Sequence, residues 1–295
     1  MTDIKSDDKC VAIIGLGLLG SSLGMALRGQ KWHRIGWTRN PETRDWAVKN
    51  DVIDETSDDV KKILAKADLT ILCLPIPIIM NFIEQHASEW RSGSIVTDIG
   101  SVKQSIVECG EKFLRPFGVY FVGSHPMAGT EKSGAAAAFP TLYKNAEAFV
   151  TKTRNTDPDA LKTVLDFWHE IGVKPVEIGV EEHDVLVAHT SHVLHVLALA
   201  LTQAVLDCPP EQQQQRFAGC ATGFRDTSRI ASSSPRMWRE IIESNQQAAL
   251  VTIKEFEKRW KHLREIIENG KFDEFEKEFA HGKELRDKWL KYKNW

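Results

Sequence analysis

The stretch CVAIIGLGLLGSSLG, residues 10–24, decides how the first part of the chain is interpreted. Its apolar start is typical of a buried strand, and the residues that follow can form a helix. Between them stand Gly15-x-Gly17-x-x-Gly20, the spacing of a dinucleotide-binding turn. The first glycine permits a tight turn, the second lets a pyrophosphate approach the backbone, and the third lets helix and strand pack closely. The predicted cofactor contacts here are Gly15, Gly17, Leu18, Leu19 and Gly20.

Short apolar runs recur through the first 180 residues and alternate with amphipathic stretches. Several are apolar at consecutive positions, as in strands of a parallel sheet that is covered on both faces. This alternation predicts a Rossmann-type, doubly wound α/β sheet. The expected strands are CVAIIG (10–15), HRIGW (33–37), LTILCLPI (69–76), SIVTDIG (94–100), VYFVG (119–123), EAFV (147–150) and VKPVEIG (173–179).

The pattern changes after about residue 180. Residues 184–206 can be one long helix, and no strand-like run follows. We therefore expect a dinucleotide-binding domain over residues 1–180 and an all-helical domain over 181–295. Aromatic residues recur at helical spacing near the end of the chain, which indicates packing and, most simply, a homodimer interface. They lie in the stripes Phe256, Trp260, Leu263 and Ile267, then Phe272, Phe275 and Phe279.

Composition argues against several classes of partner. The net charge of −3 over 295 residues leaves no surplus of basic residues for nucleic acid. We expect no membrane span, because no run of about 18 apolar residues stands out. The polar start MTDIKSDDK resembles no signal peptide, which predicts a cytoplasmic protein. The five cysteines are an odd number without a C-x-x-C pair, so we expect free thiols and neither disulfides nor a zinc site.

The end of the second expected strand bears on the choice of cofactor. An NAD site usually has an acidic residue there for the ribose hydroxyl, but this chain has Thr38 followed by Arg39. Because Arg39 could pair with a 2′-phosphate or stack on adenine, NADP is favoured over NAD. The alternative is that Arg39 is a solvated turn residue and that both cofactors bind. Leu74 and Pro75 end another strand and should receive the rest of the dinucleotide, as should residues 98–101.

GSHPMAGTEKSG, residues 123–134, follows the strand VYFVG and is too rich in glycine for a helix or a good strand. His125 is therefore expected on a loop at the carboxyl edge of the sheet, beside the nicotinamide. A dehydrogenase needs a group that takes the hydroxyl proton of its substrate, and histidine is the commonest choice near neutral pH. The alternative is a packed loop histidine.

Two motifs in the helical half carry charge. TGFRDTSRIA (222–231) places Arg225 and Arg229 on one face of a helix, with Asp226 between them. The two arginines could clamp a carboxylate or form a surface ion-pair face. HTSHVLH (189–195) spaces three histidines by three residues, but no His-Glu-x-x-His and no cysteine pair accompany them. We therefore expect no metal and interpret these histidines as polar lining of a substrate site.

Taken together, GLGLLGSSLG, DIGSVK, GSHPMAGTEKSG, SHVLH and GFRDTSRIA resemble the prephenate/arogenate dehydrogenase family of tyrosine biosynthesis. The similarity runs from about residue 10 to at least Trp238. The combination of HPMAGTE with FRDTSRIA is much more specific than the glycine spacing. The resemblance implies a Rossmann domain, a helical dimerisation domain, and the oxidation and decarboxylation of a cyclohexadienol.

The resemblance also implies roles for individual residues. His125 would take the proton of the ring hydroxyl while hydride leaves for the nicotinamide, and Ser101 would orient His125 and the cofactor. Arg229 would bind the ring carboxylate. Asp226 would orient the helix or its arginine. Thr130, Glu131 and Trp238 resemble pocket residues of the family, and His183 and His192 resemble residues of the pocket wall or of an interface. The predicted substrate contacts also include His195, and Arg225 from the paired-arginine motif.

Two departures from the family pattern matter. Val193-Leu194 replaces a Leu-Pro pair, so the helix should lack a proline kink, while the pair Thr38-Arg39 leaves the cofactor open. His195 resembles the histidine that accompanies recognition of a keto-acid side chain, which favours prephenate over arogenate. Other hypotheses are an arogenate or dual-specificity enzyme, a dinucleotide-binding sensor without catalysis, and a β-hydroxyacid or imine reductase, which lacks support from any suitably placed lysine.

Overall fold

The structure, a computed structural model, describes residues 9–130 and 132–294. The chain packs into two compact units, Met1–Gln246 and Gln247–Trp295. All the strands of the described residues lie in the first unit.

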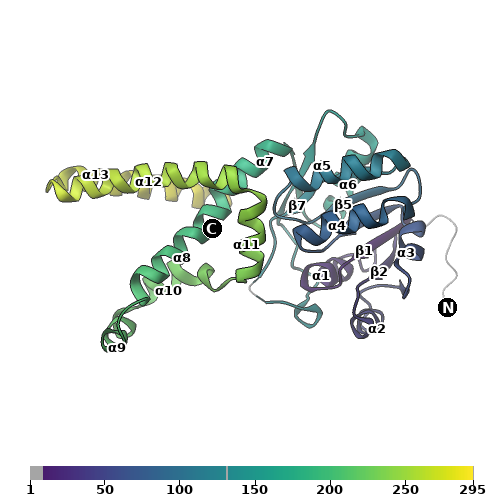
Figure 1. Ribbon diagram of the computed structural model, residues 1–295, viewed down its shortest axis with the longest axis horizontal. Coiled ribbons are helices and arrows are strands. Elements are labelled where there is room, and N and C mark those ends of the chain that lie inside the picture. Colours follow the sequence, from purple (N-terminus) through teal and green to yellow (C-terminus); the bar gives the residue numbers. More distant parts are fainter. Residues whose placement is uncertain (1–8, 131, 295) are drawn as a thin grey trace. The chain divides into compact units, whose positions relative to one another are not determined.

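The main sheet has six parallel strands in the order β3-β2-β1-β4-β5-β6. Figure 1 labels β1, β2 and β5 of this sheet. The strand order reverses between β1 and β4, and ligands of such sheets bind outside the carboxyl ends of the strands at that point. The strands are β1 Lys9–Ile14, β2 Trp32–Trp37, β3 Glu55–Thr56, β4 Leu69–Leu72, β5 Ile95–Asp98 and β6 Tyr120–Val122.

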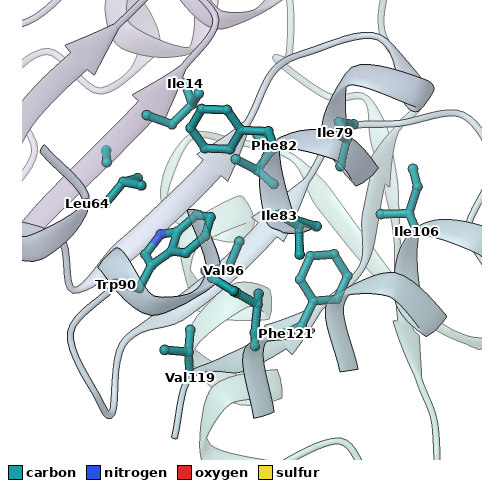
Figure 2. Close-up of a cluster of buried hydrophobic side chains, with 14 of the residues drawn as sticks. Ile14, Leu64, Ile79, Phe82, Ile83, Trp90, Val96, Ile106, Val119 and Phe121 are labelled. Carbon is teal, nitrogen blue, oxygen red and sulfur yellow. The ribbon is translucent and has the colours of Figure 1, made fainter. Parts of the chain in front are cut away.

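Helices cover both faces of this sheet, as the apolar strands require. Neighbouring strand residues point to opposite faces, so Ile14 packs with Phe82 and Trp90 in one core (Figure 2). Ile13 packs with Leu23 and Trp168 in the other. The helices of this part, including short 3₁₀ turns, are α1 Leu18–Ala26, α2 Pro41–Lys49, α3 Val60–Lys66, α4 Ile76–His86, η1 Ala87–Glu89, α5 Gln104–Leu114, η2 Arg115–Phe117, η3 Ala135–Ala137 and α6 Pro158–Glu170. The predicted doubly wound α/β sheet is confirmed.

The expectation that all the predicted strands form one sheet was wrong for the last two predicted strands. The predicted strands near residues 147–150 and 173–179 are β8 Glu147–Lys152 and β9 Lys174–Gly179, and they form a second sheet with β7 Ser124–Pro126. In this sheet β7 runs antiparallel to β8, and β9 runs parallel to it. An apolar run in the sequence indicates a strand but does not indicate its sheet. The predicted strands also omitted β3, which has only two residues.

Helices follow, as expected, and the described residues after Gly179 contain no further strand. They are α7 Val180–Val187, the π-helical segment η4 Ala188–His192, α8 Val193–Leu206, α9 Pro210–Gly219, α10 Thr222–Ser228, the 3₁₀ turn η5 Arg229–Ser232 and α11 Pro235–Ser244. The long helix predicted over residues 184–206 is thus present, with one π-helical turn inside it.

The expectation that no segment has the apolar length of a membrane span was wrong for Val180–Leu206. These 27 helical residues contain a window of mean hydropathy 1.6, of which 28% is buried. A core helix of a soluble protein passes the same test of length and composition, so the finding is weak evidence for a membrane.

The second unit consists almost entirely of two helices, α12 Gln246–Glu268 and α13 Phe272–Lys293. His262 of α12 lies 3.5 Å from the carboxylate of Glu278 of α13. Trp260 is 63% exposed and Phe279 is 72% exposed. The predicted aromatic stripes therefore leave large apolar side chains uncovered in the single chain.

Candidate active site

The glycine turn after β1 has the shape that a dinucleotide needs. Gly15 has φ +101°, and a Cβ there would lie 2.3 Å from the carbonyl oxygen of Cys73. A Cβ on Gly20 would lie 1.9 Å from the carbonyl oxygen of Gly15, so both positions require glycine. Gly17, by contrast, has nothing within 4 Å of its Cβ position and precedes the first turn of α1, which has no side-chain cap. This open backbone at a helix start fits a pyrophosphate group.

The neighbouring predicted contacts lie around this turn. The backbone oxygen of Leu19 accepts a hydrogen bond of 3.0 Å from the Tyr143 hydroxyl. Leu18 is buried. A Cβ on Gly15 would also come within 2.9 Å of the Leu74 side chain, and Pro75, directly after Leu74, is the N-cap residue of α4. The structure therefore brings the ends of β1 and β4 together at this edge of the sheet.

The turn after β2 is held by an arginine that sequence reasoning overlooked. Arg44 is buried, and its guanidinium donates to the carbonyl oxygen of Thr38 at 2.6 Å. It also forms an ion pair with Asp58. Arg39 is exposed, and its side chain has no ion pair with any described residue. Because Arg44 holds the backbone of the turn, the Arg39 side chain is left available for a ligand.

His125 lies in strand β7 and not on the loop that the glycine-rich sequence suggested. It is paired with Phe149 of β8, and three residues are enough for this short strand. Its Nδ1 atom is 3.0 Å from Nε2 of His183 on α7. Burial lowers the pKa of His125 well below its usual range, and the neighbouring basic groups of His183, Lys103 and His192 lower it further. His125 is therefore neutral at pH 7 and can accept a proton.

Behind His125 lies a carboxylate that the sequence did not reveal. Asp184 Oδ1 is 2.7 Å from Nδ1 of His183. The same carboxylate accepts the backbone N–H groups of Lys103 at 2.7 Å and Gln104 at 2.9 Å. Asp184 thereby caps the start of α5, whose own N-cap residue supplies no side-chain bond.

A buried ion pair supports the same corner of the fold. The side chains of Lys103 and Asp98 are fully buried and in direct contact. Lys103 Nζ also donates to the backbone oxygen of Ser124 at 2.8 Å, next to His125. Asp98 accepts the backbone N–H groups of Gly100 at 2.7 Å and Ser124 at 3.2 Å. Burial lowers the pKa of Lys103, and the Asp98 carboxylate opposes that change.

Ser101 follows β5 at this edge but is not hydrogen-bonded to His125. In the described part of the chain, the ring bond of His125 runs to His183 instead. The role of Ser101 as an orienting group stays a prediction.

The helical residues form the other side of the site. The His195 ring stacks on Trp238 with centroids 3.7 Å apart, and the His192 ring meets Trp238 edge-on at 6.0 Å. Asn245 donates from Nδ2 to the backbone oxygen of Asp184 at 2.8 Å and lies 3.2 Å from Nδ1 of His192. The buried atoms His192 Nε2 and Trp238 Nε1 have no hydrogen-bond partner among the described residues. Buried polar atoms of this kind can bond a ligand or an ordered water.

The arginine motif is only partly helical. α10 ends at Ser228, so Arg229 begins a 3₁₀ turn, while Arg225 bonds Asp226 at 3.0 Å on the surface. Arg229 is exposed. Burial is the main cause that lowers the pKa of His195, and the positive charge of Arg229 lowers it further. Arg229 therefore lies on the His195 side of the site, whereas Arg225 is engaged elsewhere.

One further predicted residue, Thr130, lies in the loop after β7. Thr130 is exposed, and its hydroxyl accepts the backbone N–H of Lys132 at 3.1 Å. Glu131 lies outside the described residues. Among residues 9–130 and 132–294, no three His, Cys, Asp or Glu side chains are grouped as metal ligands.

We expect acid to destabilise the fold through His192. Burial lowers the pKa of His192 from 6.5 to about 4. Below pH 6.5 the unfolded chain binds a proton that the folded chain excludes, so stability falls as the pH falls towards 4. At about pH 5 this amounts to about 2 kcal/mol. Urea unfolding near pH 7 and near pH 5 should show a smaller loss for His192→Gln than for the wild type. Equal losses in both proteins would contradict this, and His281→Gln, at an exposed site, is the control.

The fold, the dinucleotide turn after β1 and the neutral His125, next to Ser124 that bonds Asp98 at the end of β5, are those of a nicotinamide-dependent dehydrogenase. Comparison with known proteins narrows this class. The model of the prephenate dehydrogenase nucleotide-binding domain matches residues 23–177, and that of the prephenate dehydrogenase dimerization domain matches residues 179–281. The chain belongs to the prephenate dehydrogenase family.

Individual relatives agree with this assignment. The chain is 32% identical to the cyclohexadienyl dehydrogenase of Zymomonas mobilis, over 94% of this chain and 95% of that one. It is also 32% identical to the prephenate dehydrogenase of Bacillus subtilis, over 94% of this chain and 75% of the relative.

Solved structures give the same result. Prephenate dehydrogenase from A. aeolicus, in complex with hydroxyphenyl propionate and NAD+, superposes with a TM-score of 0.88 at 33% identity, covering 96% and 99% of the two chains. Synechocystis arogenate dehydrogenase has a TM-score of 0.84 at 30% identity, covering 95% and 99%. A 3-hydroxyisobutyrate dehydrogenase from Salmonella typhimurium, at 12% identity and a TM-score of 0.56, shares the fold alone.

Proposed function

We propose that the protein is a prephenate dehydrogenase, which converts prephenate to 4-hydroxyphenylpyruvate and CO2. The observation that carries this proposal is the neutral His125, held by His183 at the edge of the sheet where the dinucleotide turn lies. The bound dinucleotide supplies the acceptor for the hydride that leaves ring carbon C4. His125 takes the hydroxyl proton at the same carbon, and the ring carboxylate leaves as CO2, so that its bonding electrons make the ring aromatic. The proton on His125 can return to the phenolate oxygen.

The helical side of the site supports binding of a small dianion. Arg229 is the cation available for the ring carboxylate, because Arg225 is engaged with Asp226. His192 and Trp238 each offer a buried ring nitrogen that has no hydrogen-bond partner among the described residues, and the stacked His195 would contact the keto-acid side chain. These substrate roles, with Thr130 and Glu131, remain proposals.

The experiment is a two-by-two grid of prephenate or arogenate with NAD or NADP, followed by reduced cofactor at 340 nm. We expect faster turnover of prephenate than of arogenate. Equal turnover of both would make the protein a dual-specificity cyclohexadienyl dehydrogenase, the name of the Zymomonas relative. Faster turnover of arogenate would make it an arogenate dehydrogenase, the name of the Synechocystis relative. Cofactor binding without turnover of either substrate would support the non-catalytic sensor.

We propose NADP as the preferred cofactor, because Arg39 is exposed and unpaired in the described structure and no carboxylate ends β2. A solved relative binds NAD+, so NAD is the alternative. Replacing Arg39 by Ala should raise KM for NADP about tenfold, as expected for a lost charged hydrogen bond, and leave KM for NAD unchanged. Arg154→Ala, at another exposed arginine, is the control. Unchanged KM values for both cofactors would show that Arg39 is a solvated turn residue.

We also propose that residues 1–180 form the dinucleotide-binding domain, that residues 181–295 form the substrate and dimerisation domain, and that the protein is a cytoplasmic homodimer. The two domain matches meet between residues 177 and 179, which supports this boundary. The exposed apolar side chains of α8, such as Leu199, support a subunit contact there. The stripes on α12 and α13 do so as well.

A further inference from the structure

The hydrogen bonds behind His125 fix which of its ring nitrogens carries a proton. Asp184 uses both carboxylate oxygens to accept backbone N–H groups, those of Lys103 and Gln104. It is therefore an acceptor towards His183 as well, and the proton in the 2.7 Å contact must lie on His183 Nδ1.

The position of the proton on the His183 ring decides the position of the proton on the His125 ring. A neutral imidazole has one protonated nitrogen, so His183 with a proton on Nδ1 has a lone pair on Nε2. That lone pair faces His125 Nδ1 at 3.0 Å. A hydrogen bond forms there only if His125 Nδ1 carries the proton.

We propose that Asp184 and His183 are positioning residues that hold His125 in the tautomer with a free lone pair on Nε2. This deepens the proposed function, because it names the atom that accepts the substrate proton. The two nitrogens lie on different edges of the ring, so Nε2 is directed away from His183. When Nε2 takes a proton, the imidazolium gains a charge-assisted bond from Nδ1 to His183, backed by the Asp184 carboxylate.

The surroundings keep His183 neutral in this arrangement. His183 is fully buried, and its pKa is lowered by burial although Asp184 opposes the change. The ammonium of Lys103, facing from the loop before α5, lowers the pKa values of both His183 and His125. His192 from the π-helical segment lowers that of His125 as well, and Asp98 acts on His183 in the opposite direction.

The test combines a direct observation of the tautomer with kinetics. Long-range ¹⁵N–¹H correlation spectra of protein labelled with ¹⁵N-histidine distinguish the two tautomers, and the His125→Asn variant identifies the His125 signals. We expect wild-type His125 and His183 both to carry their protons on Nδ1 near pH 7. A proton on His125 Nε2 in the wild type would overturn the proposal. This measurement needs no substrate, so it stands even if the proposed reaction fails.

Two variants of His183 then separate positioning from packing. In His183→Gln, the amide can accept from His125 with its oxygen and donate to Asp184 with its nitrogen. In His183→Met, a side chain of similar length can do neither. We expect His183→Met to lose the fixed His125 tautomer and about 10²-fold in kcat with little change in KM. His183→Gln should keep the tautomer and stay within about tenfold of the wild type. Equal kcat and equal spectra for both variants would overturn the proposal.

Discussion

Replacing His125 by Asn should lower kcat for prephenate by about 10³-fold, within the range for a lost general base. Asn has a similar size and can still pair with the backbone of β8, so the strand should be kept. It cannot accept the hydroxyl proton, so hydride transfer would have to leave a protonated carbonyl oxygen. Initial-rate assays of reduced cofactor at 340 nm measure the loss of kcat. Calorimetric titration with the cofactor checks that the dinucleotide site is intact.

The histidine itself must be responsible for this effect. His281→Asn, at an exposed position on α13, should leave kcat unchanged. The acid limb of the kcat/KM profile offers a second check. The pKa of His125 is lowered, so wild-type activity should fall only well below pH 6.5. If the His125→Asn enzyme kept a tenth or more of the wild-type kcat, His125 would not be the general base of the reaction.

Replacing Lys103 by Met should destabilise the protein by about 3 to 5 kcal/mol, the usual cost of leaving a buried charge unpaired. The Asp98 carboxylate would keep two backbone N–H bonds but lose the ammonium group of Lys103 in a fully buried site. The backbone oxygen of Ser124 would lose its ammonium donor as well. Urea unfolding followed by tryptophan fluorescence measures the change.

Two further variants make this result specific to the buried pair. Lys152→Met breaks an exposed ion pair with Glu177 and should cost less than about 1 kcal/mol. Asp98→Asn combined with Lys103→Met removes both charges, so it should be more stable than Lys103→Met alone. A loss in Lys103→Met as small as that in Lys152→Met would show that water or a shift of Asp98 compensates the charge.

The sequence allowed the main features of the fold to be predicted because they depend on local patterns. The glycine spacing and the consecutive apolar residues of β1 are enough to indicate a strand, a turn and a helix in order. The helical second half follows from the absence of strand-like runs. The division into two sheets could not be predicted, because the residues of β8 have the same pattern in either sheet.

Residues of the candidate site could be proposed from the sequence only where the residue type and its motif alone suggest a chemical role. His125 stands out in a motif, and so does Arg229. Asp184 does not, because its importance depends on Lys103 and Gln104, some 80 residues earlier in the chain. A signal did exist in Lys103: a lysine just after an apolar strand and a DIGS turn, in a position where burial is expected, requires a partner.

The π-helical segment Ala188–His192 has a consequence for how this helix can change in evolution. A π-helical turn inside an α-helix corresponds to one additional residue, and each residue advances an α-helix by about 100°. Deleting one residue from the segment would favour a plain α-helix and turn His192 and His195 relative to His183. His183 on α7 bonds His125, and His195 on α8 stacks on Trp238. The number of residues between His183 and His195 is therefore constrained separately from which residues they are. Insertions and deletions here should be tolerated far less than substitutions at Thr190, whose side chain is exposed.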